Sequence, residues 1–164
     1  MPKSKSPKRK YNPDRFVRRL IAGSERRIDA RELTDSQQRD LGLCYHMAFE
    51  TMLKNGDEES WYVLAGSLNV ALVLAEQGYG EEFIPEVKAA MGGLMNAKYR
   101  ADRTGRWAFD GDAIQAMRTA LTIHDQQCAL AKRSEIKKAL QAITERANAG
   151  YMYAASECEL KEAA

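Results

Sequence analysis

Residues that favour α-helix dominate the apolar part of this sequence. Ala, Leu and Met together number 45, whereas the strand formers Val and Ile together number 12. In several segments the apolar residues recur every three or four positions, which is the spacing of one helical face. The chain has 164 residues, which is enough for one compact domain and short for two. These features predict an all-α, single-domain, irregular bundle of about five helices.

Five segments carry this helical spacing. Thr34 begins a T-x-x-Q sequence, which is the spacing of a capping box at a helix start. Residues 70–75 are apolar on almost every side, so the second segment is expected to be the central helix. Gly92 and Gly93 weaken the third segment and predict a kink or a close contact with another helix. The expected helices cover residues 34–54, 57–77, 80–104, 110–128 and 134–150.

A short segment without helical spacing follows the third of these helices. Trp107 and Phe109 are two positions apart, so both side chains face the same side of an extended chain. We expect them to fill the space between the third and fourth helices, with Arg106 and Ala108 facing outward. The alternative is that Trp107 is an exposed platform on which a nucleic-acid base stacks.

The charges are divided between the two parts of the chain. The net charge is +2, but residues 1–27 carry a net of +8 and residues 28–164 a net of −6. Residues 1–13 contain three prolines, two serines and five cations, a composition that predicts a disordered, flexible basic arm. We expect a helical domain over 14–150 and a frayed or partner-dependent helix over 151–164.

The first residues of that domain have an amphipathic pattern. Phe16, Val17, Leu20 and Ile21 form one stripe of a short helix that is flanked by arginines. A helix of two turns is too short to be stable alone. We therefore expect it to fold on a surface, which is a nucleic acid, a membrane or the body of the protein.

A basic arm on an acidic body is typical of a protein that binds a polyanion. The sequence therefore predicts a non-enzymatic protein that binds nucleic acid or a nucleoprotein complex through its arm. A second group of cations lies beside Tyr99 and Trp107, an arrangement that suits phosphate contact with base stacking. The expected nucleic-acid-binding residues are Lys3, Lys5, Lys8, Arg9, Lys10, Arg15, Arg18, Arg19, Lys98, Arg100, Arg103 and Arg106.

The acidic body supports an alternative hypothesis. The protein would then be an inhibitor or adaptor that occupies a basic, nucleic-acid-binding groove of a host protein. The acidic groups also occur at expected helix starts, where the helix dipole alone explains them. The expected protein-binding residues are Asp57, Glu58, Glu59, Glu81, Glu82 and Glu86.

The sequence offers little support for catalysis. It has no G-x-S-x-G elbow and no phosphate-binding glycine loop. An enzyme would need one of two helical pairs, His46 with Glu50 or His124 with Cys128, to lie in a pocket. His124 and Cys128 have the i, i+4 spacing that could share a metal on one helical face, but the sequence has no C-x-x-C or H-x-x-x-H pair. We expect no catalytic residue, no metal and no cofactor.

The sequence also indicates a compartment. The sequence has no run of about 18 apolar residues, which a membrane-spanning helix would need. The basic first residues are not followed by the apolar stretch of a secretory signal. The three cysteines are few and odd in number, which favours a reducing environment. We expect a cytoplasmic protein, with an oligomeric state that the sequence leaves open.

Four short motifs carry a resemblance to a known group of proteins. They are Lys8-Arg9-Lys10-Tyr11, Leu74-Ala75-Glu76-Gln77-Gly78, Thr104-Gly105-Arg106-Trp107-Ala108-Phe109-Asp110-Gly111 and His124-Asp125-Gln126-Gln127. In this order they resemble landmarks of small, all-helical accessory proteins of proteobacterial prophages and plasmids. The resemblance assigns no catalytic or binding residue. It implies a protein of a mobile element, with a regulatory role or a role in blocking host defence.

Overall fold

The computed structural model of the chain describes residues 13–149, and these form helices joined by short connections. Among the described residues there is no strand, only two isolated β-bridges. The expectations for Lys3, Lys5, Lys8, Arg9 and Lys10 and for the segment 151–164 lie outside the described residues. The elements are α1 (Pro13–Asp29), α2 (Asp35–Asn55), α3 (Glu58–Glu76), the 3-10 helix η1 (Glu81–Phe83), α4 (Ile84–Thr104), α5 (Gly111–Leu130) and α6 (Arg133–Asn148).

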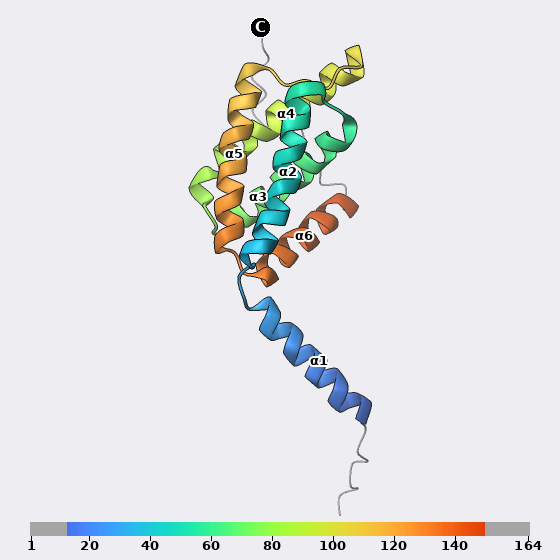
Figure 1. Cartoon of the computed structure of the whole chain (residues 1–164), viewed down its shortest axis with the longest axis vertical. Helices are drawn as coiled ribbons and strands as arrows, with labels where there is room; N and C mark the ends of the chain where they lie inside the picture. The colour runs from blue at the N-terminus through green and yellow to red at the C-terminus, as the bar shows by residue number, and fades with distance from the viewer. Residues whose placement is uncertain (1–12, 150–164) are drawn as a thin grey trace, which may run out of the picture.

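Helix α3 is the centre of the bundle, as its apolar sequence predicts. It packs against α2, α4, α5 and α6 (Figure 1). Leu64, Leu68 and Leu72 are completely buried along it. The Nε1 of Trp61, near its start, donates a 2.8 Å hydrogen bond to the backbone oxygen of Leu94 in α4. An apolar helix covered on several sides removes more hydrophobic surface from water than a surface helix does.

Helices α4 and α5 make the closest helix pair. A Cβ on Gly93 would lie only 2.6 Å from the Cβ of Ala113, so the absence of a side chain at Gly93 permits the approach. The expected close contact at the glycine pair is therefore confirmed. Pro85 lies in the first turn of α4, where its missing N–H costs no helical hydrogen bond.

The starts of the helices are fixed by side chains that the sequence partly predicts. Thr34 forms the expected capping box with Gln37 at the start of α2. Asp110, at the expected start of the next-to-last helix, accepts a hydrogen bond from the backbone N–H of Ala113. The last helix is expected from residue 134, but α6 already begins at Arg133. Here the carboxylate of Glu135 accepts from the backbone N–H of Lys132.

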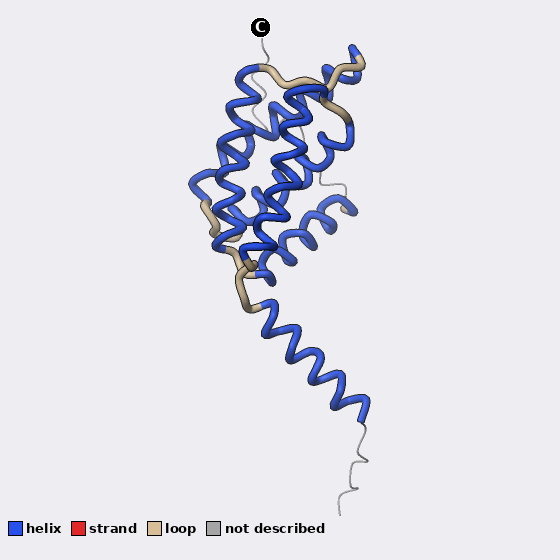
Figure 2. The backbone as a smooth tube through the Cα atoms, in the orientation of Figure 1, coloured by secondary structure: helices blue, strands red, loops and turns tan. Residues whose placement is uncertain are grey.

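Helix α1 differs most from expectation. It has 17 residues rather than two turns, and it extends away from the bundle from a point beside the start of α6 (Figure 1 and Figure 2). Asp29 at its end pairs with Lys137 and Arg133 of α6, at 2.7 Å and 3.8 Å. These contacts stabilise a last turn that the sequence pattern alone did not indicate. With α1 the described chain has six α-helices instead of about five.

Candidate functional site

The described arginines of α1 are open to solvent and are distributed around about half of the helix circumference. The side chains of Arg18, Arg26 and Arg27 are exposed, with Glu25 as an exposed acidic neighbour. Because the C-terminal end of α1 joins the bundle, its free end is the N-terminus, where the helix dipole is positive. Of the exposed arginines, Arg18 is the one nearer this end, whereas Arg26 and Arg27 lie in the last turn, near the junction with the bundle. Arg15 and Arg19 belong to this helix, but their side chains are not among those that the structure describes.

The second basic group lies at the opposite end of the bundle from α1. Lys98, Arg100 and Arg103 belong to the last turns of α4, which is at the upper end of Figure 1. Arg100 donates a 2.7 Å hydrogen bond to the backbone oxygen of Ala108, and Lys98 pairs with Asp102 at 3.3 Å. These two cations hold the local structure. The fold does not join this group and α1 into one surface.

The segment between α4 and α5 covers the same end of the bundle. Trp107 and Phe109 are half-buried and pack against the main core. Their ring neighbours are Trp61 of α3, at 5.9 Å, and Phe49 of α2, at 6.1 Å. Their ring contacts are therefore with α2 and α3, and the cluster that they cover also includes residues of α4 and α5. Arg106 is exposed as expected, whereas Ala108 is half-buried.

The acidic residues form two separate groups. Asp57 caps α3, and its carboxylate accepts a 2.7 Å hydrogen bond from the Ser60 N–H, which lowers the pKa of Asp57. Glu58 and Glu59 follow in the first turn of the same helix. Glu81, Glu82 and Glu86 lie beyond the other end of α3, whose 19 residues span about 28 Å. The two groups thus do not share one contact surface.

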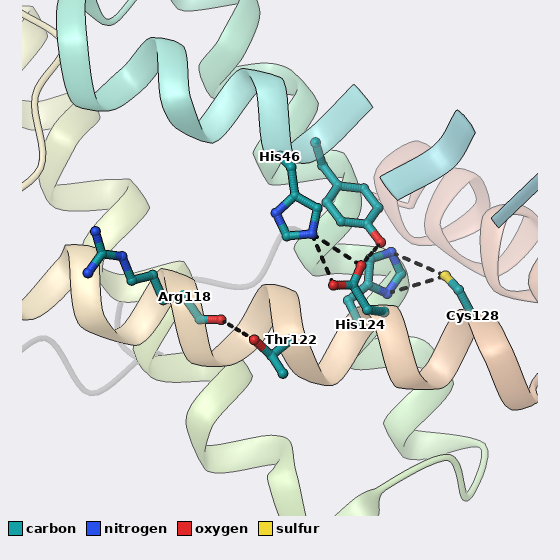
Figure 3. Close-up of polar contacts among 7 residues, drawn as sticks. His46, Arg118, Thr122, His124 and Cys128 are labelled. Atoms are coloured by element: carbon teal, nitrogen blue, oxygen red, sulfur yellow. Dashed lines mark hydrogen bonds and ion pairs between the residues drawn. The ribbon is translucent and has the colours of Figure 1, made fainter. Parts of the chain in front are cut away.

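A polar cluster that the sequence did not predict connects α2 with α5 (Figure 3). The hydroxyl of Tyr45 donates to Asp125, and the Nε2 of His46 lies 3.0 Å from the other carboxylate oxygen of Asp125. Tyr45 is buried, and its burial together with the Asp125 carboxylate raises the pKa of its hydroxyl. The expected pair of His46 with Glu50 does not form, since Glu50 pairs with Lys54 at 3.8 Å.

His124 and Cys128 are close together, as their spacing predicts, but both are buried. The Cys128 sulfur lies 3.8 Å from Nε2 of His124. Burial raises the pKa of Cys128 to about 11 and lowers the pKa of His124, so both are neutral at pH 7. A thiol with such a pKa is a poor nucleophile. Within residues 13–149, no group of three or more His, Cys, Asp or Glu is arranged to hold a metal ion.

Gln127 fixes the position of this buried pair. Its side-chain oxygen accepts from Nδ1 of His124, at 3.3 Å. Its amide nitrogen donates to the backbone oxygens of Ala71 and Tyr79, at 3.0 Å and 2.9 Å. Every polar atom of the Gln127 side chain is thus used inside the protein, which indicates a role in holding α5 to α3.

An apolar groove of about 320 Å³ lies next to these residues, between α2, α3, α5 and α6. Its lining includes the buried side chains of Tyr45, His124 and Cys128. Three large apolar side chains of the groove remain open to water, namely Leu41 at 43%, Tyr62 at 60% and Leu140 at 52% exposure. We call it the α2–α6 groove. No charged side chain lines it, since His124 is neutral.

Sequence reasoning found the basic helix and both acidic groups but missed Tyr45, Asp125 and the groove. Tyr45 and Asp125 are 80 positions apart, and no local pattern connects them. Within the described part of the chain, no helix has the length and hydropathy that crossing a membrane requires. Comparison with known proteins gives no match among family models, curated proteins or solved structures, so the resemblance to prophage and plasmid proteins stays a prediction.

Proposed function

We propose that this protein binds nucleic acid through the arginines of α1 and the basic residues that precede it. The observation that carries this proposal is the position of α1. A helix with exposed Arg18, Arg26 and Arg27 extends from the bundle and meets it only near Asp29. Phosphate groups can therefore approach Arg18 without meeting a surface of the bundle, whereas Arg26 and Arg27 lie in the last turn, next to the junction.

The charge of the bundle supports the same proposal. Residues 32–149 contain 13 basic and 17 acidic side chains, so the bundle repels a polyanion weakly while the N-terminal part attracts it. This division of charge orients the protein on nucleic acid, with α1 against the phosphates and the bundle away from them. Contacts of this kind position a protein on nucleic acid without reading its sequence.

The polar cluster at Asp125 supports a structural role better than a catalytic one. The Tyr45 hydroxyl is held as a donor to Asp125, and burial keeps Cys128 protonated. Covalent catalysis through Cys128 would need a thiolate, and burial keeps this thiol protonated. The competing proposal of an acidic protein-binding surface is weaker, because the two acidic groups lie about 28 Å apart along α3.

A binding experiment with matched variants tests the proposal. Fluorescence anisotropy with a random duplex and a random single strand is measured for the full chain and for the triple variant Arg18→Ala, Arg26→Ala, Arg27→Ala. We expect the triple variant to bind at least about tenfold more weakly, since each lost phosphate contact costs free energy. The control variant, Arg103→Ala with Arg106→Ala, removes exposed cations at the other end of the bundle.

The outcomes separate the two hypotheses. A loss in the α1 variant with little change in the control supports binding through α1. Equal binding by the α1 variant and the unchanged protein contradicts it. Undetectable binding of either probe by the unchanged protein also contradicts it and favours the protein-binding alternative.

A further inference from the structure

We propose that this protein forms a two-fold symmetric dimer in which α1 of each copy lies in the α2–α6 groove of the other. The proposal concerns assembly and does not depend on nucleic-acid binding. It starts from two apolar surfaces of the same chain that are both open to water, one on α1 and one on the bundle.

The first surface lies on α1. Ile21 is 52% exposed and Ile28 is 48% exposed. They are seven positions apart, so they lie on the same face of the helix. Arg26 is two positions from Ile28 and therefore about 160° away around the helix axis. A partner that covers the isoleucines thus leaves Arg26 in solvent, whereas Arg27 lies about 100° and Arg18 about 60° from the covered face.

The second surface is the groove. Its exposed members Leu41, Tyr62 and Leu140 come from three helices and surround an apolar lining. An amphipathic helix that lays its apolar face into such a groove is a common mode of protein recognition. Helix α1 has 17 residues and α6, which forms one side of the groove, has 16, so both are about 25 Å long.

The junction between α1 and the bundle directs α1 away from the groove of its own chain. Asp29 pairs with Lys137, and the backbone N–H of Arg133 donates a 2.9 Å hydrogen bond to the oxygen of Arg31. A β-bridge joins Glu32 with Lys132. These contacts hold residues 29–32 against the start of α6, and α1 continues outward from there (Figure 2). Docking within one chain would break them, whereas docking on a second copy keeps them.

Charge and symmetry favour a second copy as the occupant. Residues 13–31 carry six basic and three acidic side chains, opposite in sign to the excess on residues 32–149. Exchange of identical helices closes after two copies when a two-fold axis relates the chains, since each copy then fills the groove of the other. The dimer would present two basic helices, which increases the apparent affinity for a long polyanion.

The test is the molar mass of the full chain in solution, measured by light scattering and sedimentation over a range of concentrations. We expect twice the chain mass for the unchanged protein at high concentration. Leu41→Glu and Ile21→Glu would each bury a charge at the interface and should raise the dimer dissociation constant at least about tenfold. Leu140→Glu and Ile28→Glu are second variants of the same two surfaces.

Leu43→Glu is the matched control. Leu43 lies on α2, two positions from Leu41, is 58% exposed and is not part of the groove. We expect this variant to dimerise like the unchanged protein. All substituted positions are about half exposed, and circular dichroism verifies that each variant is folded.

Three results would overturn the proposal. A monomer at every concentration shows that no second copy occupies the groove. Loss of the dimer with Ile21→Glu and Ile28→Glu but not with Leu41→Glu and Leu140→Glu indicates that α1 pairs with α1. The reverse pattern indicates that another segment fills the groove.

Discussion

Asp29 lies 2.7 Å from the Nζ of Lys137, and this ion pair attaches the end of α1 to α6 across 108 positions of sequence. Arg133 approaches the same carboxylate at 3.8 Å. The pair matters for function because it sets the direction in which the basic helix leaves the bundle. Lys137 is 55% exposed, so water and salt weaken the attraction.

Replacement of Asp29 by Ala should therefore change mobility more than stability. We expect a loss of at most about 1 kcal/mol in the free energy of unfolding, because the pair is partly exposed. Backbone amides of residues 24–31 should exchange hydrogen faster, while those of α3 should not change. Hydrogen exchange read by mass spectrometry measures both. Glu50→Ala is the control, since it removes an exposed pair inside α2. Unchanged exchange in residues 24–31 would contradict the anchoring role.

The contact of Gly93 with Ala113 gives a prediction about packing. Gly93→Ala should lower the free energy of unfolding by about 1–3 kcal/mol, because the new Cβ would meet the Cβ of Ala113 and its backbone. Gly66→Ala in α3 has open space around the new Cβ within one chain and should stabilise the monomer by up to about 1 kcal/mol. Urea unfolding of both variants makes the comparison. Equal effects would show that the close approach of α4 and α5 is not required.

The two tryptophans should differ in their contribution to stability. Trp61 is 8% exposed and hydrogen-bonded, so Trp61→Ala should cost about 3–5 kcal/mol. Trp107 is half-buried, and Trp107→Ala should cost about 2 kcal/mol. Thermal unfolding is compared with nucleic-acid binding for both variants. Unchanged melting of Trp107→Ala together with weaker binding would show that Trp107 is a stacking platform instead of a cover for the core.

His124 makes stability depend on pH. Its pKa in the folded state is lowered by burial, whereas an unfolded histidine titrates near pH 6.5. The unfolded state therefore binds a proton more readily, and stability is full above about pH 6.5 and falls as the pH drops below it. Urea unfolding between pH 8 and pH 5 should show this decrease. It should be smaller in His124→Gln and retained in His46→Gln. The same decrease in all three proteins would assign it to other groups.

The sequence predicted the helices of the bundle well because each carries its own local signals. The capping box at Thr34, the turn at Gly105 and the apolar run in residues 70–75 all act within a few positions. The length of α1 was predicted poorly, since its last turns contain Gly23 and Ser24 and are held by Lys137, far away in sequence. A contact between residues so far apart in the sequence cannot be predicted from a local pattern.

The candidate sites divide in the same way. The basic residues of α1 follow from the sequence, because a local excess of charge is visible in the order of the residues. Lys98 lies far from α1 because the end of α4 is at the opposite end of the bundle, and Glu58 and Glu82 lie near opposite ends of α3. Both separations depend on how the helices pack, which the sequence does not show. The α2–α6 groove requires side chains from four helices and could be recognised only in three dimensions.

The salt dependence of nucleic-acid binding tests the central claim most directly. Each phosphate contact made by a cation releases counterions. Each contact therefore makes the slope of log affinity against log salt concentration more negative by about 1. For duplex DNA, the triple variant Arg18→Gln, Arg26→Gln, Arg27→Gln should therefore reduce the slope by about 2 to 3. The variant Arg103→Gln, Arg106→Gln should leave it nearly unchanged. An unchanged slope in the α1 variant would contradict binding through α1.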